Sequence, residues 1–410
     1  MPYRHRPAVV ATAVLTFLGL LAPRAAAADA PPSMLFGTLL THEARAKEEA
    51  AAGVAVVHLE LAWDRYEPAD GQFSDRYAAQ AKAKLNAYRA AGMKVVLGTG
   101  LQHPPRWATE LPGGRFVNQD GVAGPPRAAN LTFNPALRAR AERYLARVAA
   151  DLGTDFWAVR VGSGPYVECF YPAHDAERTA NSYWCYDAEA QRGCPFPGWR
   201  PGERSYKGKP FAPADVRRWY DWYLGAMVDG IDWQVAAYRR LGYRGDVHVL
   251  MPGVGSRPGD LRRCLDRYLD ADADKLHTTS RAAAWHEVIA RLKDKAGVVV
   301  YVSSVADGSG GNDLPQPADR AVKVDDPAVN KWSATRWLTY LADRHGLAKA
   351  GENPGRGDAN GYGPGMLTAA VAQARAGRFK AFLWAHDHNL YDGTGPTLAQ
   401  YAEAIAAAGK

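Results

Sequence analysis

Two glutamates stand out in the sequence because each follows a predicted strand. Glu168 comes after the apolar run Phe156–Val161, within the aromatic segment GPYVECFYP at positions 164–172. Aromatic surroundings shield a carboxyl from water, which raises its pKa and makes it a proton donor. Glu352 comes after the predicted strand Gly346–Ala350, in the segment GENPG at positions 351–355. Two carboxylates facing one site are what glycosidic bond cleavage requires, one to protonate the leaving oxygen and one to attack or to activate water.

Other polar and aromatic residues near predicted strand ends form a candidate sugar-binding shell. Tryptophan offers an apolar face with a donor at its edge, which suits a pyranose ring. A carboxylate inside an apolar run, such as Glu60, is expected to be paired or to bind a sugar hydroxyl. The shell comprises Glu60, Trp63, His103, Trp107, Tyr166, Trp384, His386 and Asp387. Trp63 and Trp384 can equally belong to the core, and Glu60 to an interior packing layer.

The elements that must position these residues alternate between short β-branched runs and longer amphipathic stretches. The predicted strands are Met34–Leu40, Val54–Leu61, Lys94–Gly98, Phe156–Val161, Val247–Met251, Val298–Ser303, Gly346–Ala350 and Phe379–Trp384. The predicted helices are Asp75–Ala91, Pro135–Leu152, Pro213–Leu241, Arg281–Ala296, Lys331–His345, Gly365–Gly377 and Thr397–Ala408. Eight alternations predict a single α/β domain over residues 29–410, a (β/α)8 TIM barrel with long βα loops. An open doubly wound sheet is less favoured, because no strand-to-helix turn carries a Gly-x-Gly-x-x-Gly loop.

A long loop from Pro172 to Pro210 follows the fourth predicted strand, on the face where barrel active sites are built. Its aromatic residues are either a small satellite core or stacking platforms for sugar rings, and the sequence favours neither. They are Tyr171, Tyr183, Trp184, Tyr186, Phe196, Trp199 and Tyr206. The loop also holds Cys185 and Cys194, which we expect to form a disulfide in an oxidising compartment. A bridge between Cys169 and Cys264 depends on a tertiary contact that the sequence cannot show.

The first 28 residues have the pattern of a signal peptide: two arginines, an apolar run from Ala8 to Ala22, and small residues before Asp29. We therefore expect secretion, with no membrane attachment after cleavage. Removal of residues 1–28 takes away three arginines and no acid, which lowers the formal charge from +7 to +4. Basic and acidic residues are interleaved along the helical segments, so nucleic acid is a poor partner. Oligomeric state is left open.

Several segments resemble known glycoside hydrolases. GPYVECFYP (164–172) and AGEN (350–353) are similar to the segments around the proton donor and the base of the family 14 β-amylases. HLELAWDRYEPADGQF (58–73) resembles the second strand unit of clan A barrels such as the family 42 β-galactosidases and the family 5 enzymes. HPPRW (103–107) is similar to their aromatic loop after the third strand, and Trp384 is placed like the tryptophan that floors their catalytic subsite. The resemblance implies a barrel glycosidase that acts on an oligo- or polysaccharide, with Glu168 as general acid and Glu352 as nucleophile or base.

Two other readings remain open. His58, His103, His248, His386 and His388 lie on or just after predicted strands, which makes a metal-dependent barrel hydrolase conceivable. We rank it below the glycosidase, whose mechanism needs no metal and no cofactor. The third reading is a catalytically inactive carbohydrate-binding barrel. The pair Glu168 and Glu352 argues against it, because a protein that only binds sugar does not need both acids.

Overall fold

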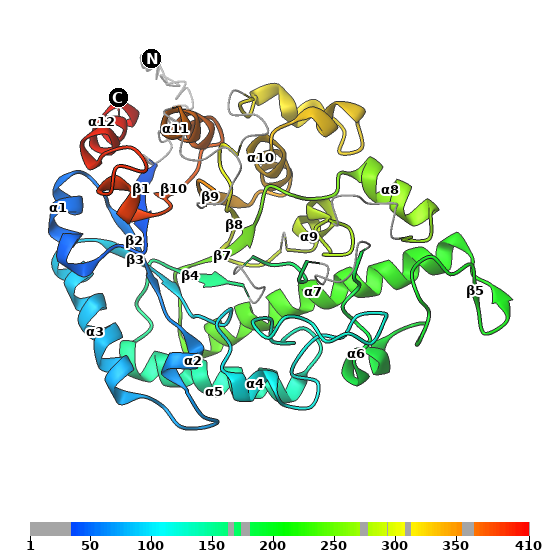
Figure 1. Ribbon diagram of the computed structural model, residues 1–410. Helices are drawn as coiled ribbons and strands as arrows, with labels where there is room; N and C mark the ends of the chain where they lie inside the picture. Colours follow the sequence, from blue (N-terminus) through cyan, green and yellow to red (C-terminus); the bar gives the residue numbers. More distant parts are fainter. Residues whose placement is uncertain are drawn as a thin grey trace, which may run out of the picture. The chain divides into compact units, whose positions relative to one another are not determined.

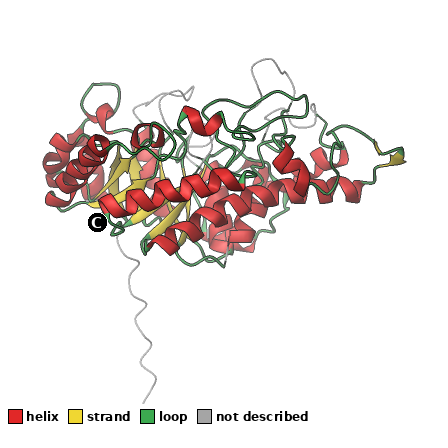
Figure 2. Ribbon diagram, turned by 90° about the horizontal axis from the view of Figure 1, so that it is seen from below, coloured by secondary structure: helices red, strands yellow, loops and turns green. Residues whose placement is uncertain are grey.

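The computed structural model describes residues 34–162, 168–173, 181–270, 278–292, 294–307, 313–354 and 365–409. All of them fall in the compact unit Ser33–Lys410. Eight parallel strands form a closed barrel in the order β1-β10-β9-β8-β7-β4-β3-β2, and helices lie around it (Figures 1 and 2). The predicted (β/α)8 barrel is therefore confirmed.

Each predicted barrel strand is present. The barrel strands are β1 (Leu35–Leu39), β2 (Val56–Glu60), β3 (Lys94–Gly98), β4 (Ala158–Val161), β7 (Asp246–Met251), β8 (Val298–Val302), β9 (Ala348–Glu352) and β10 (Ala381–Trp384). The largest difference is at β9, which begins and ends two residues later than predicted. Its last residue, Glu352, is in register with Leu383 of β10. Glu352 thus belongs to the rigid sheet and not to the loop after it.

Seven helices of the described residues match predicted ones, and five helices of nine residues or fewer were not predicted. They are α1 (Ala46–Ala51), α2 (Trp63–Tyr66), α3 (Asp75–Ala90), α4 (Arg106–Thr109), α5 (Pro135–Leu152), α6 (Ala188–Gly193), α7 (Pro213–Leu241), α8 (Pro258–Asp266), α9 (Trp285–Leu292), α10 (Ala334–Arg344), α11 (Met366–Ala376) and α12 (Leu398–Ala408). Side-chain oxygens of Ser74 and Asn134 cap the first turns of α3 and α5. Helix α9 begins four residues later than predicted because Ala282 adopts a left-handed backbone with φ of 57°.

Side chains alternate between two apolar layers along the barrel strands. The inner layer fills the barrel and includes Val56, Val96, Ala158, Tyr301 and Leu383. The outer layer packs the strands against the helices. The inner layer has small residues on two adjacent strands, namely Ala348, Ala350 and Ala381. Because these side chains are short, the barrel has room for larger polar side chains from the strands opposite.

The long segment between β4 and α7 forms a satellite core outside the barrel. We use this name for the packed rings of Tyr171, Tyr183, Trp184, Trp199, Phe211, Trp219 and Tyr223. All of them are at most 3% exposed. Tyr171 stacks on Tyr223 of α7, with ring centroids 4.3 Å apart. The most buried aromatic side chains of this loop therefore form a satellite core, the first of the two predicted alternatives, and not stacking platforms for sugar rings.

The predicted disulfide between Cys185 and Cys194 is absent, and both thiols are buried. Cys185 lies inside the aromatic packing, where burial raises the pKa of its thiol well above the ordinary value. Cys194 follows the last residue of α6, and its thiol lies next to Trp219. The expectation failed because it was argued from the compartment and the short spacing, whereas the structure packs both thiols as small apolar side chains.

Candidate active site

Glu352 lies at the carboxyl end of β9, held by two neighbouring side chains of the barrel interior. Its Oε2 atom accepts hydrogen bonds from Arg160 Nη2 at 2.6 Å and from the Tyr301 hydroxyl at 2.7 Å. Arg160 Nη2 also donates to the Tyr301 hydroxyl at 2.7 Å. The other carboxylate oxygen, Oε1, accepts no hydrogen bond from a described residue. One oxygen of Glu352 is thus anchored by two donors.

Arg160 and Tyr301 point into the barrel because of strand alternation. On β4, Ala158 faces inward and Val159 outward, so Arg160 faces inward again. Only 3% of Arg160 is exposed. Burial opposes its charge, but the interactions with Glu352, Tyr301 and Glu60 together outweigh burial and raise the pKa of the guanidinium. A cation so placed compensates the negative charge of the Glu352 carboxylate.

Glu168 has the opposite surroundings. Burial, reinforced by the charge of Glu352, raises the pKa of its carboxyl to about 7. Its only hydrogen bond from another described side chain comes from the Ser303 hydroxyl at 3.3 Å, and its Oε2 atom is buried without a partner among the described residues. The next residue fixes its place, because the Cys169 amide donates to the Leu250 carbonyl of β7 at 3.0 Å. A carboxyl in this setting holds a proton near neutral pH.

Glu60 ends β2 and is fully engaged by protein groups. Its Oε2 atom lies 3.0 Å from His58 Nε2, and its Oε1 atom accepts a hydrogen bond from the Gln102 amide. Burial alone would raise the pKa of Glu60, but His58 and Arg160 outweigh it and hold that pKa below its ordinary value. A Cβ atom at Gly98 would lie 2.3 Å from Glu60 Oε2 and 2.5 Å from His58 Nε2. Glycine at position 98 is therefore required for this pair to fit.

Two tryptophans predicted to contact sugar are instead core residues. Trp384 faces outward from β10, is fully buried, and packs against Tyr401 of α12. The adjacent Leu383 and Ala385 face the barrel interior, so strand alternation turns Trp384 away from it. Trp63 is also fully buried, stacks on Tyr144 and donates from its indole to Glu67 at 2.8 Å. Neither indole presents a face to a ligand.

The remaining predicted shell residues that the structure describes are spread around the barrel mouth. His103 is exposed after β3, and Trp107 is half-buried on α4, with its indole nitrogen donating to the Glu67 carbonyl at 3.0 Å. His386 is half-buried after β10, close enough to Glu352 for that charge to act on its pKa, which burial lowers. Asp387 is buried and tied to the loop after β1, accepting from the His42 amide at 3.1 Å. Tyr166 lies outside the described residues.

Sequence reasoning missed Arg160, Tyr301, Ser303 and Gln102. Arg160 carried a readable signal, because a charged residue within a predicted buried strand is costly unless it is paired. Tyr301 gave a weaker one, as an aromatic hydroxyl in a run of valines. The hydrogen-bond partners of Arg160 and Tyr301 could not be predicted from the sequence, because Arg160, Tyr301 and Glu352 come from three strands that meet only when the barrel closes.

The histidines that suggested a metal site do not gather. Among the residues that the structure describes, no group of three or more His, Cys, Asp or Glu side chains is placed to hold a metal ion. His248 lies inside the barrel, stacked on Tyr301 with ring centroids 5.0 Å apart. His386 and His388 stack on each other after β10.

Within the described ranges, every helix is too short or too polar to span a membrane.

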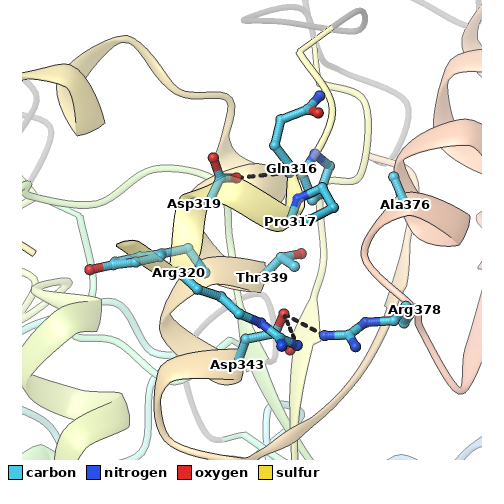
Figure 3. Close-up of a pocket in the computed structure, with 10 residues that line it drawn as sticks. Gln316, Pro317, Asp319, Arg320, Thr339, Asp343, Ala376 and Arg378 are labelled. Atoms are coloured by element: carbon cyan, nitrogen blue, oxygen red, sulfur yellow. Dashed lines mark hydrogen bonds and ion pairs between the residues drawn. The ribbon is translucent and has the colours of Figure 1, made fainter. Parts of the chain in front are cut away.

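A separate cavity of about 190 Å³ (Figure 3) lies near the amino ends of β9 and β10. Its lining includes Arg320, Thr339, Asp343 and Arg378. Asp343 pairs with Lys349, the second residue of β9, and with Arg378, which precedes β10. The cavity therefore lies by the amino ends of these strands, whereas Glu352 lies at a carboxyl end. It is not part of the carboxylate site.

The fold is shared with enzymes of known structure. The chain is similar to the catalytic domain of β-amylase from Paenibacillus polymyxa, with a TM-score of 0.65, 14% identity, and coverage of 92% of this chain and 99% of that one. It is also similar to β-galactosidase from the psychrophilic Marinomonas ef1, with a TM-score of 0.54 and 14% identity. That match covers 92% of this chain and 59% of the galactosidase. No protein-family model matches the sequence, and no curated protein matches it significantly.

Proposed function

We propose that this protein is a glycoside hydrolase that cleaves O-glycosidic bonds of an oligo- or polysaccharide. The observation that carries the proposal is the contrast between two carboxyl groups of one site. Glu352 is anchored by a guanidinium and a phenol, whereas Glu168 is buried with one weak hydroxyl partner. The sharing of the fold with a β-amylase and a β-galactosidase supports the same conclusion, because both act on glycosidic bonds.

In this proposal Glu168 is the general acid. Its pKa of about 7 leaves a substantial fraction of the carboxyl protonated at neutral pH. The proton passes from Glu168 to the oxygen of the leaving sugar as the glycosidic bond breaks, and Glu168 becomes an anion. The nearby charge of Glu352, which raises the pKa of Glu168, strengthens this tendency to hold and then deliver a proton.

Glu352 is the nucleophile or the base. Arg160 and Tyr301 fix Oε2, so that Oε1 is available either to attack the anomeric carbon or to accept a proton from an attacking water. The separation of the two carboxyl groups decides between these routes: about 5 Å goes with retention, and roughly 6.5–9.5 Å with inversion. His103, Trp107 and His386 contribute to sugar binding in this scheme, as side chains at the mouth of the barrel.

Residues 1–28 direct export, which brings the enzyme to extracellular glycans.

The test is Glu168→Gln, assayed on two kinds of substrate. A natural glycan has a poor leaving group and needs the proton, so its turnover should fall by about 10²–10⁴-fold. An activated aryl glycoside needs little protonation and should keep most of its bond-cleaving rate. The matched control is Glu403→Gln, an exposed glutamate on α12, which should leave both rates unchanged.

Three outcomes would overturn the assignment. Equal loss on both substrates would mean that Glu168 does not act as the acid. Binding of glycans by the unaltered protein without any turnover would point to the carbohydrate-binding alternative. Activity that is lost on chelation and restored by Zn²⁺ would favour the metal-dependent alternative.

A further inference from the structure

The carboxyl of Glu168 is held only weakly by other side chains. Among the described residues, its one hydrogen-bonded side-chain partner is the Ser303 hydroxyl at 3.3 Å. A general acid must keep its proton within hydrogen-bond reach of the leaving oxygen, and a misplacement of about 1 Å removes much of its effect. The position of this carboxyl therefore depends on how the backbone that carries it is anchored.

The residues after Glu168 are anchored in two ways. Cys169 is bonded to the barrel strands β7 and β4 through its amide and its thiol. Phe170 and Tyr171 are instead bonded to Arg281. The Arg281 guanidinium lies over the Phe170 ring, 3.5 Å from its centroid. Arg281 Nε donates to the Tyr171 carbonyl at 3.1 Å, and the Arg281 carbonyl accepts from the Tyr171 amide at 3.1 Å. We call these three contacts the Arg281 clamp.

The partners of the Arg281 clamp are shielded from water. Phe170 is 6% exposed and Tyr171 is 1% exposed. A cation–π contact and a hydrogen bond are both stronger where water is excluded. The Tyr171 ring also stacks on Tyr223, and the Tyr171 hydroxyl donates to the Tyr223 carbonyl at 3.1 Å. The segment that follows the acid is thus tied both to the clamp and to the satellite core.

The segment that carries Arg281 is itself fixed from two sides. It lies between α8 and α9. The Tyr223 hydroxyl of α7 donates to the Ser280 carbonyl at 2.7 Å. The Ser256 amide donates to the Ala283 carbonyl at 2.9 Å. Because the chain is held on both sides of Arg281, the clamp sets where the acid-bearing segment lies.

We propose that Arg281 is a positioning residue for the general acid, which keeps Glu168 in place by fixing Phe170 and Tyr171. The proposal rests on the function assigned to Glu168 above. Arginine suits this task because its planar guanidinium can lie on a ring while Nε donates a hydrogen bond in the same plane. Arg281 acts through the backbone, so its loss leaves the acid present but lets the carboxyl move away from the leaving oxygen.

Loss of the clamp should therefore affect only the step that needs the proton. Arg281→Met keeps an apolar stem but removes the cation and the Nε donor. Turnover of a natural glycan should fall by about 10–100-fold, through kcat and with KM little changed. The bond-cleaving rate on an activated aryl glycoside should stay nearly the same. A merely destabilised protein would lose both activities in equal proportion, because an unfolded molecule acts on neither substrate.

Two further variants sharpen this test. Arg281→Lys keeps a cation but not the planar group, so it should show the same selective loss at a smaller size. The matched control is Arg218→Met, because Arg218 of α7 also lies over a phenylalanine ring, that of Phe196, at 5.5 Å from its centroid. This control should leave both rates unchanged.

Hydrogen exchange in the free protein tests the clamp without any turnover. The amides of residues 169–171 should exchange faster in Arg281→Met than in the unaltered protein, because their segment opens more easily once the clamp is lost. Arg218→Met should leave their exchange unchanged.

The other outcomes would overturn the proposal. Equal loss on both substrates, or no loss on the natural glycan, would mean that Arg281 does not position the acid. A raised KM with unchanged amide exchange would make Arg281 a sugar-binding residue. Should Arg281→Met fail to fold, the selectivity of Arg281→Lys decides. An unaltered protein that cleaves no glycan would refute the proposed function instead, and the amide exchange would still show whether Arg281 fixes the segment.

Discussion

The barrel interior near Glu352 and the satellite core beside α7 are both buried, but they are built from different chemistry. In the first, Arg160, Tyr301 and Glu352 are joined by hydrogen bonds of 2.6–2.7 Å. In the second, aromatic rings pack on one another, and Trp219 stacks on Tyr223 with centroids 5.3 Å apart. Ring packing stabilises the fold through area and shape, whereas buried charges are costly to assemble and contribute less net stability. The comparison teaches that this chain concentrates stability in one region and reactivity in the other.

The largest effect on reactivity is expected at Glu352. Glu352→Gln keeps an oxygen that can accept hydrogen bonds from Arg160 and Tyr301, but it removes the carboxylate that acts as nucleophile or base. Turnover of every glycoside, activated or not, should fall by at least about a thousandfold. This differs from Glu168→Gln, which should spare activated substrates. A variant that kept a tenth of the rate on natural glycans would show that Glu352 is not the reacting carboxylate.

The largest effect on stability is expected in the satellite core. Trp219 is fully buried among aromatic rings, so Trp219→Ala should lower the free energy of unfolding by about 3–5 kcal/mol. Urea denaturation measures this loss, and the rate per folded molecule should change little. The milder Trp219→Phe should lose less stability by the same measure. A variant of normal stability with weakened glycan binding would instead make these rings part of the substrate cleft.

A smaller effect concerns pH. The pKa of Glu168 is raised to about 7 in the folded protein, so its proton is lost as the pH rises through that value. The rate on natural glycans should therefore fall on the alkaline side with an apparent pKa near 7, and this limb should be missing from the profile of Glu168→Gln. The stability of the folded protein should also fall as the pH rises. The raised pKa of Glu168 favours the folded state at low pH, and this contribution is lost between the ordinary carboxyl pKa and about 7. A flat profile from pH 6 to 9 would contradict the role of Glu168.

The fold was predictable because the strands are buried β-branched runs and the helices are bounded by clear signals such as Ser74 and Asn134. That Glu168 and Glu352 follow strands of one barrel was predictable because strand ends in a barrel converge on one face; their catalytic roles stay a prediction. The direction in which a strand side chain points, into or out of the barrel, was not predictable, as Trp384 shows. In a parallel sheet covered on both faces, both sets of alternate residues are apolar, so Phe382 and Trp384 carry no mark that they face outward. The Arg160 contacts were not predictable either, since they depend on which strands lie opposite each other.

Helix α7 joins the two regions that differ so much in chemistry. Its 29 residues span about 43 Å. Its amino-terminal half supplies Trp219 and Tyr223 to the satellite core, and near its carboxyl end Tyr238 donates to the Arg160 carbonyl. A helix anchored at both ends cannot fray from one of them alone. The amides of α7 and β4 should therefore exchange their hydrogens with solvent in one cooperative opening, so that loosening the aromatic packing would be felt as faster exchange at the strand that carries Arg160.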